Sequence, residues 1–243
     1  MAPEMTTHQP TPVSGTFALT PQQIAYFDTF GFLKLPGLFR ADIGELTAAF
    51  ESVFAATDEP MVLSNNPYHQ TRDARFQDRP RLTVPLFIEQ NEALGRLRTD
   101  PRVVGIAQSL LGPEFEYAHS DGNLFYCDVY WHLDAFGSPI HQRHIKLYFY
   151  LDALRHESGA LRVIPGTGDL GGSYVTTVRQ LFNDPDTARQ TLGIELDEVP
   201  SWTLEVDPGD VIIGNYRTMH ATFGGGPRRR LFTVNFKEPL PAT

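Results

Sequence analysis

The stretch Gly-Asn-Leu-Phe-Tyr-Cys-Asp-Val-Tyr-Trp-His-Leu-Asp, residues 122–134, decides how the second half of the chain is expected to fold. Its apolar run, Gly122–Trp131, leads into a histidine and, two residues later, an aspartate. A series of short apolar runs bounded by turn residues indicates a β-sandwich or barrel. Further runs between clusters of Gly, Pro, Asp and Asn are Ile145–Leu151, Ala160–Ile164, Thr203–Val206, Val211–Ile213 and Leu231–Phe236.

Helical patterns precede this β-rich region. Thr20-Pro21-Gln22-Gln23 has the residues of a helix start: an N-cap threonine, a proline at the first helical position and a capping-box glutamine. Gly31 is expected to end this helix, and Phe32–Leu35 alternates as a short strand. Apolar spacing predicts a second helix over residues 41–56 and another near Val103–Leu111. The order is therefore helices first and a β-rich core second.

Composition limits the classes of function. The chain has 243 residues, 41% hydrophobic and 20% charged, which is ordinary for one globular domain. Its 20 basic and 29 acidic residues give a net charge of −9, so nothing electrostatic favours nucleic acid or an anionic membrane. No apolar run reaches the roughly 18 residues of a membrane span, and no secretory signal is recognisable. With the single cysteine Cys127, these features predict a soluble cytoplasmic protein.

A candidate metal site follows from three residues. His132 and Asp134 lie two apart at a predicted strand end, where residues i and i+2 point to the same face. They could therefore reach one metal, with a third ligand from another strand. His220 is the candidate, because it follows the predicted strand after the Pro-Gly-Asp turn at Asp210. Two histidines and one carboxylate form the facial triad of non-heme iron(II) oxygenases, which leaves three positions open for cosubstrate and oxygen.

A cluster of three arginines, Arg228–Arg230, follows His220 closely. If iron binds a 2-oxo acid, the far carboxylate of that acid needs a cation, and arginine grips carboxylates with two parallel hydrogen bonds. Strand alternation puts Arg229 on a mostly polar face, so Arg229 is chosen as the anchor; a solvated arginine turn is the alternative. The polar face holds Arg229, Leu231, Thr233 and Asn235, and the opposite face holds Arg228, Arg230, Phe232, Val234 and Phe236.

Taken together, these motifs resemble the phytanoyl-CoA dioxygenase family of iron(II)- and 2-oxoglutarate-dependent oxygenases. The similarity runs in order from about residue 17 to 237, nearly the whole chain. Each motif is moderately specific, and the ordered set is highly specific. The matching segments are Leu19–Phe27 with Gly31–Phe39, Trp131-His132-Leu133-Asp134, Tyr150-Leu151-Asp152, Ser158–Thr167, and Gly209–His220 with the arginines after it.

The resemblance implies roles for individual residues. His132, Asp134 and His220 match the family's iron ligands, and Arg229 matches its 2-oxoglutarate-binding arginine. Two features depart from the family: Gly168 stands where its turn usually has histidine, and the interval from His220 to Arg229 is short, so Arg230 stays the runner-up. Further candidates for cosubstrate binding are Thr222, two residues after the distal histidine, and Tyr148 and Lys146 on one face of a strand.

The resemblance also implies a mainly β fold: a double-stranded β-helix (jelly roll, cupin-like) core with flanking N-terminal α-helices. The predicted division is a flexible arm, 1–18, and a single oxygenase domain, 19–243, with a helical part, 19–112, and a jelly-roll core, 113–240. Substrate choice is expected in the breaker-rich loop 58–81 and in 168–200, because loops on a rigid scaffold carry specificity.

The predicted function is a dioxygenase that uses Fe(II), 2-oxoglutarate and O2 to hydroxylate a small molecule, with release of succinate and CO2; secondary-metabolite tailoring is the expected context. Asp134 favours hydroxylation, since related halogenases have a small residue in its place; desaturation and ring formation stay open. Two alternatives are a metal-dependent jelly-roll enzyme that does not use 2-oxoglutarate and a non-catalytic cupin-like binding module. The substrate and the oligomeric state are not predicted.

Several other residues have simpler interpretations. Histidines 141, 144 and 156 are expected to be exposed loop residues. Cys127 is expected to be a small core residue, and Trp131 and Trp202 are expected to be packing residues.

Overall fold

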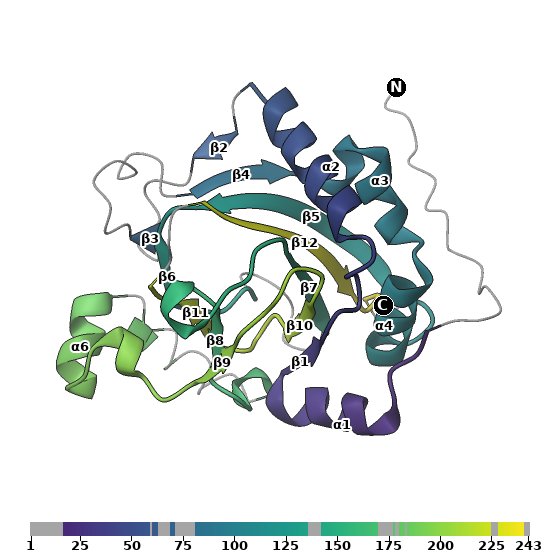
Figure 1. The fold of residues 1–243 in the computed structure, drawn as a ribbon. Coiled ribbons are helices and arrows are strands. Elements are labelled where there is room, and N and C mark those ends of the chain that lie inside the picture. Colours follow the sequence, from purple (N-terminus) through teal and green to yellow (C-terminus); the bar gives the residue numbers. More distant parts are fainter. Residues whose placement is uncertain are drawn as a thin grey trace, which may run out of the picture.

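Two antiparallel β-sheets form the core of the computed structural model (Figure 1). The structure describes residues 17–58, 60–62, 69–70, 81–135, 142–169, 177, 180–182, 184–224 and 228–240. One sheet contains, in spatial order, β1 (Phe32–Leu35), β10 (Val211–Asn215), β7 (His144–Tyr150), β12 (Arg229–Lys237), β5 (Glu116–Phe125), β4 (Arg81–Pro85) and β2 (Met61–Val62). The other contains β3 (His69–Gln70), β6 (Asp128–His132), β11 (His220–Thr222), β8 (Leu161–Val163) and β9 (Trp202–Leu204).

The order of the strands confirms the predicted jelly roll. From β5 to β12 the chain supplies four neighbouring strands to each sheet: β10, β7, β12 and β5 to the first, and β6, β11, β8 and β9 to the second. All neighbouring pairs among these strands are antiparallel. Two facing four-stranded antiparallel sheets connected in this way are the jelly-roll arrangement, and the β-sandwich predicted from the short apolar runs is confirmed.

The predicted run Gly122–Trp131 is not one strand. It is split into the end of β5 and most of β6, which belong to different sheets. The chain crosses between the sheets at residues 126–127, and Cys127 is buried there as predicted. The sequence carries no turn residue at this crossing, because Phe125, Cys127 and Val129 all stay in one apolar cluster between the sheets.

Helices cover the outer face of the seven-stranded sheet (Figure 1). Side chains of α2 and α4, including Phe50 and Ile106, share one hydrophobic cluster with strand residues such as Phe149, Phe232 and Val234. The smaller α6 packs near Trp131, which is fully buried. The α-helices are α1 (Pro21–Phe30), α2 (Ile43–Ala56), α3 (Glu92–Gly95), α4 (Pro101–Leu111) and α6 (Pro185–Leu192). The 3-10 helices are η2 (Ile88–Gln90), η3 (Arg96–Arg98), η4 (His156–Ser158), η5 (Thr167–Asp169) and η6 (Leu196–Glu198).

The first helix has the predicted ends. Thr20 Oγ1 accepts from the Gln23 N–H at 3.2 Å, and Gln23 Oε1 accepts from the Thr20 N–H at 2.8 Å. Gly31 ends α1 with φ +81°, and a Cβ there would lie 2.1 Å from Thr218 Oγ1, so this position requires glycine. The second helix begins at Ile43, two residues after the predicted start. Its N-cap residue, Asp42, makes no side-chain capping hydrogen bond, and its carboxylate instead accepts from Arg102 at 2.8 Å.

Some expectations fall outside the described chain. The predicted arm lies there except for residues 17 and 18, as do most of loop 58–81 and His141. The division into arm, helical part and core stays a prediction. Within the described residues, no helix has the length and apolar character that a membrane crossing requires.

Candidate metal centre

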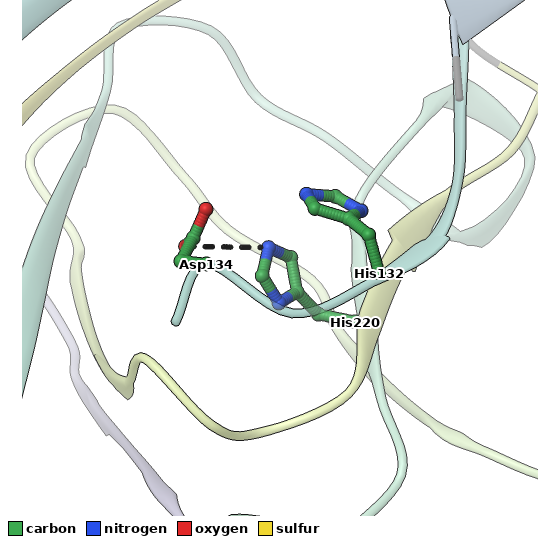
Figure 2. A group of neighbouring side chains, drawn as sticks. All are labelled: His132, Asp134 and His220. Atoms are coloured by element: carbon green, nitrogen blue, oxygen red, sulfur yellow. Dashed lines mark ion pairs between the residues drawn. The ribbon is translucent and has the colours of Figure 1, made fainter. Parts of the chain in front are cut away.

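Two neighbouring strands of the smaller sheet bring the predicted histidines together. His132 ends β6 and is the register partner of His220, which begins β11. Their ring centroids lie 4.2 Å apart. Asp134 follows β6, and its backbone N–H donates to the Tyr216 carbonyl at 2.9 Å. One potential ligand atom from each of the three side chains lies within 4.8 Å of the others, and Asp134 Oδ2 is 3.5 Å from His220 Nε2 (Figure 2).

Both imidazoles are oriented by backbone carbonyls. His132 Nδ1 lies 2.7 Å from the Tyr130 carbonyl, and His220 Nδ1 lies 2.9 Å from the Thr218 carbonyl. A carbonyl only accepts, so each Nδ1 carries the proton and each neutral ring keeps its lone pair on Nε2. Fixing the tautomer through the second ring nitrogen is how metal-binding histidines are prepared for their ion.

The charge state of the cluster also suits a cation. Burial lowers the pKa of His132 well below its ordinary value, and burial likewise lowers the pKa of His220. Burial alone would raise the pKa of the Asp134 carboxyl, but the charge and hydrogen bond of the Lys146 ammonium bring it below its ordinary value. At neutral pH the cluster is therefore two neutral imidazoles and one carboxylate, the forms in which these groups bind metals.

All the predicted site residues line one cavity between the sheets. The cavity is mixed in character, with polar groups set among apolar side chains such as Phe125, Val129 and Leu161. Binding sites for small molecules commonly combine apolar walls with a few convergent polar groups. The site residues predicted from the sequence that line it are His132, Asp134, Lys146, Tyr148, His220, Thr222 and Arg229.

Arg229 and Thr222 carry unused hydrogen-bonding capacity in this cavity. Arg229 is buried, donates to the carbonyls of Gly159 and Cys127, and forms no ion pair with a described residue. Arg229 Nε and Thr222 Oγ1 are buried and have no hydrogen-bond partner among the described residues. A buried charge without a counter-ion is costly. The pair therefore fits a carboxylate ligand, which would supply the missing acceptor and the missing charge.

The neighbouring arginines are placed differently. Arg228 pairs with Glu51 at 2.6 Å, and Arg230 pairs with both Glu51 and Asp152. Neither is among the residues that line the cavity. The alternation that assigned Arg229 to the polar face of its strand is therefore seen in the structure, and the runner-up Arg230 lies on the other face.

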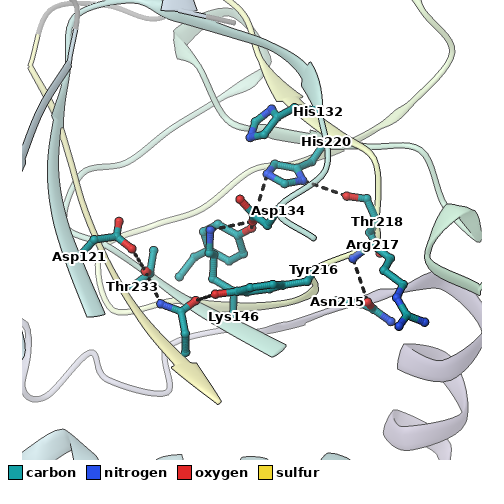
Figure 3. Close-up of polar contacts among 12 residues, drawn as sticks. Asp121, His132, Asp134, Lys146, Asn215, Tyr216, Arg217, Thr218, His220 and Thr233 are labelled. Atoms are coloured by element: carbon teal, nitrogen blue, oxygen red, sulfur yellow. Dashed lines mark hydrogen bonds and ion pairs between the residues drawn. The ribbon is translucent and has the colours of Figure 1, made fainter. Parts of the chain in front are cut away.

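Tyr148 and Lys146 both reach the acid of the cluster. Lys146 Nζ lies 2.7 Å from Asp134 Oδ2 (Figure 3). The Tyr148 hydroxyl donates to the same oxygen at 3.3 Å. These contacts connect them to Asp134, whereas the prediction from the sequence was cosubstrate binding. That binding role stays a prediction.

The turn before the distal histidine has a support that differs from the family's. Thr167 Oγ1 accepts from the Met219 N–H at 2.8 Å, next to His220. At Gly168 a Cβ would lie 3.0 Å from Thr218 Oγ1, so this site has little room for the histidine that the family usually carries. Thr167 holds the strand of His220 from this turn.

Four residues of the cavity wall were not among the site residues predicted from the sequence. Asp121 accepts from the Thr233 hydroxyl at 2.7 Å (Figure 3). The Asp121 carboxylate also lies 3.7 Å from the Arg81 guanidinium. Asn123 accepts from Arg81 Nε at 2.8 Å. All four line the cavity. The strand alternation did place Thr233 beside Arg229, but Arg81 was assigned to the end of a loop and begins β4 instead.

Two simple interpretations are corrected. Trp202 is 60% exposed and so is not a packing residue, because β9 lies at the edge of its sheet. His144 is half-buried at the start of β7, with its ring 5.0 Å from that of Tyr216, and is not an exposed loop residue. His156 is exposed, as expected.

The jelly roll and its two-histidine, one-carboxylate cluster define the class of non-heme iron oxygenases. A family model described as phytanoyl-CoA dioxygenase (PhyH) matches residues 27–230. The chain therefore belongs to the phytanoyl-CoA dioxygenase family, within the superfamily of Fe/2-oxoglutarate enzymes, and the resemblance seen in the sequence is confirmed.

Solved structures share the fold at low sequence identity. SnoK, a non-heme α-ketoglutarate-dependent carbocyclase from nogalamycin biosynthesis, has a TM-score of 0.66 and 17% identity over 93% of this chain and 87% of its own. HygX from Streptomyces hygroscopicus, with nickel and 2-oxoglutarate bound, has a TM-score of 0.65 and 17% identity over 92% of this chain and 88% of its own. EctD from S. alaskensis in its apoform has a TM-score of 0.64 and 18% identity over 98% of this chain and 83% of its own. A comparison with curated proteins gave no significant match.

Proposed function

We propose that this chain is an Fe(II)- and 2-oxoglutarate-dependent dioxygenase that hydroxylates an unactivated C–H bond of a small molecule. The observation that carries the proposal is one cavity that contains both the cluster of His132, Asp134 and His220 and a buried arginine, Arg229, which forms no ion pair with any residue that the structure describes. The reaction consumes O2 and releases succinate and CO2. Bound Fe(II) supplies the redox chemistry that couples decarboxylation of the 2-oxo acid to oxidation of the substrate.

The three cluster residues would hold the iron. Three protein ligands leave positions open for other ligands, which a catalytic site needs and a closed structural site lacks. The carbonyls that bind both Nδ1 atoms keep the two Nε2 atoms directed toward Asp134. The protein therefore has little reorganisation to make when the metal enters.

Arg229 and Thr222 would hold the far carboxylate of 2-oxoglutarate. Arg229 Nε and Thr222 Oγ1 have no hydrogen-bond partner among the described residues, and both side chains line the cavity that contains the candidate metal ligands. Apolar residues beside them, Leu231 and Leu161, keep water away from the charge pair, which strengthens it. This arrangement supports a 2-oxo acid over a metal enzyme that uses no such cosubstrate.

The class of substrate is supported by what structural relatives bind. HygX was solved with hygromycin B bound, and the epimerase SnoN with nogalamycin RO. These are small molecules, so we propose a small-molecule substrate here, with secondary-metabolite tailoring as its context. Because SnoK is a carbocyclase and SnoN an epimerase, product analysis has to separate hydroxylation from ring formation and epimerisation.

An anaerobic titration tests the proposal. Fe(II) and then 2-oxoglutarate are added to the protein, and the visible charge-transfer band of the chelate is recorded. We expect a band for the unaltered chain and none for His132→Ala. Fe(II) uptake without the band would support a metal enzyme that does not use 2-oxoglutarate. Protein that takes up no iron would support a non-catalytic binding module.

Turnover is tested separately by succinate formation in the presence of candidate substrates under 18O2. We expect extra succinate with a true substrate and one labelled oxygen in its product. A product with the same formula as the substrate, or two hydrogens fewer, would point to epimerisation or to desaturation and ring formation.

A further inference from the structure

Lys146 forms an ion pair with Asp134, the carboxylate of the candidate metal site. It lies on β7, and its ammonium is 2.7 Å from Asp134 Oδ2, with 14% and 16% of the two side chains exposed. The ammonium also lies 5.3 Å from the ring centroid of Tyr216 (Figure 3) and 5.5 Å from that of Tyr148. Two aromatic faces and one carboxylate therefore fix a positive charge beside the position where a dication would bind.

We infer that Lys146 is the built-in counter-ion of Asp134, which keeps the ligand cluster assembled without metal at the expense of affinity for the metal. The inference rests on the proposed function, because it requires Asp134 to bind the metal. Without metal, Lys146 balances the negative charge of Asp134, with which it forms an ion pair at 2.7 Å. With metal, the same ammonium repels the dication across a largely buried site.

The positive charge of Lys146 affects metal binding more than its hydrogen bond to Asp134 does, because other contacts also hold Asp134 in position. Its backbone N–H donates to the Tyr216 carbonyl at 2.9 Å, and its Oδ2 accepts from the Tyr148 hydroxyl at 3.3 Å. Removal of the ammonium therefore leaves the carboxylate near its position but with its full negative charge available to the metal. A partner that only positioned the carboxylate would have the opposite effect, because loss of such partners weakens metal binding.

Three substitutions separate charge from hydrogen bonding. Lys146→Met removes both, Lys146→Gln removes the charge but keeps a donor, and Lys146→Arg keeps both. Lys237→Met is the matched control, because it removes a lysine that pairs with Glu116 at 3.3 Å at the far end of β12 and lies outside the cavity. The probe is Co(II), whose binding is followed by its visible absorption without O2 or turnover.

We expect Lys146→Met and Lys146→Gln to bind Co(II) about tenfold or more tightly than the unaltered chain, and Lys146→Arg and Lys237→Met to match it. The metal-free Tm should fall in both neutral variants, and Co(II) should raise that Tm more than it does in the unaltered chain. The greater stabilisation is required because metal and ammonium stabilise the same carboxylate.

Unchanged or weaker Co(II) binding in both neutral variants would overturn the inference. Weaker binding in the methionine variant with normal binding in the glutamine variant would identify Lys146 as a positioning donor only, which also overturns it. If Lys146→Met does not fold, the glutamine variant decides alone. Failure of the unaltered chain to bind Co(II) would instead contradict the proposed function, so the two failures are distinguishable.

Discussion

Two neighbouring arginines on opposite faces of β12 have opposite environments. Arg229 faces the cavity, is buried and has a donor with no partner in the described part of the chain, whereas Arg230 faces outward and is paired with Asp152 and Glu51. An arginine whose charge is already balanced stabilises the fold. One that is buried without a counter-ion costs free energy unless a ligand completes it. The inner face of the sheet is therefore built for a ligand and the outer face for packing.

The largest expected effect concerns the cavity that Arg229 faces, at the candidate metal site. His132→Ala removes one of three metal ligands, so we expect turnover to fall by roughly a thousandfold or more, with loss of the Fe(II)–2-oxoglutarate band. Circular dichroism should show the native fold, because His132 is not part of the hydrophobic clusters that hold the two sheets together. A variant that retained the band would place the metal elsewhere.

The second prediction compares the two arginines directly. Arg229→Gln should raise the KM for 2-oxoglutarate by roughly a hundredfold, because a charged bidentate contact is lost in a buried site. Arg230→Gln should leave that KM unchanged and lower the free energy of unfolding by about 1 kcal/mol, since it loses partly exposed ion pairs.

Succinate assays at varied 2-oxoglutarate and urea unfolding of both variants measure these quantities. Equal KM values for the two variants would remove the distinction between the faces. A raised KM in the Arg230 variant alone would reverse the assignment of the anchor.

The third prediction concerns pH and the metal-free cluster. His132 and His220 have pKa values below the ordinary value, so between their folded and unfolded pKa values the unfolded chain binds more protons. Their contribution to stability is therefore present above about pH 6.5, the unfolded value, and is lost as the pH falls toward their folded pKa values. Asp134, whose pKa is also lowered, acts in the same direction at more acid pH.

Urea unfolding of metal-free protein between about pH 7.5 and 5 measures this dependence. His220→Gln should reduce its slope, because one of the groups that titrates on unfolding is gone. An unchanged slope would mean that His220 does not titrate differently in the folded and unfolded chain.

Local regularities explain how much of this could be predicted from the sequence. The capping box at Thr20, the pair His132 and Asp134 and the assignment of Arg229 each depend on residues a few positions apart, where helix and strand periods hold. Strand alternation alone separated Arg229 from Arg230. The ordered family motifs then joined His220, far along the chain, to the same centre.

Contacts set by packing could not be predicted. The crossing at Cys127 has no turn residue, because both sheets bury the chain there. The contact of Lys146 with Asp134 and the placement of Arg81 in the cavity depend on how β7 and β4 lie beside other strands. The same limit applies to Trp202, which is exposed only because its strand lies at an edge.

The smallest expected effect sharpens the comparison on the smaller sheet. Thr222 faces the cavity with a buried hydroxyl that has no partner among the described residues, so it should bind the same carboxylate as Arg229. Thr222→Val keeps the shape and removes one hydrogen bond to an ionised carboxylate, which is worth about 2 kcal/mol. We therefore expect the KM for 2-oxoglutarate to rise about thirtyfold and the kcat to change little. Because the hydroxyl is unsatisfied without a ligand, valine should also leave the ligand-free protein as stable as before or slightly more stable. A lower stability together with an unchanged KM would mean that the hydroxyl serves the fold and that Arg229 binds the carboxylate without it.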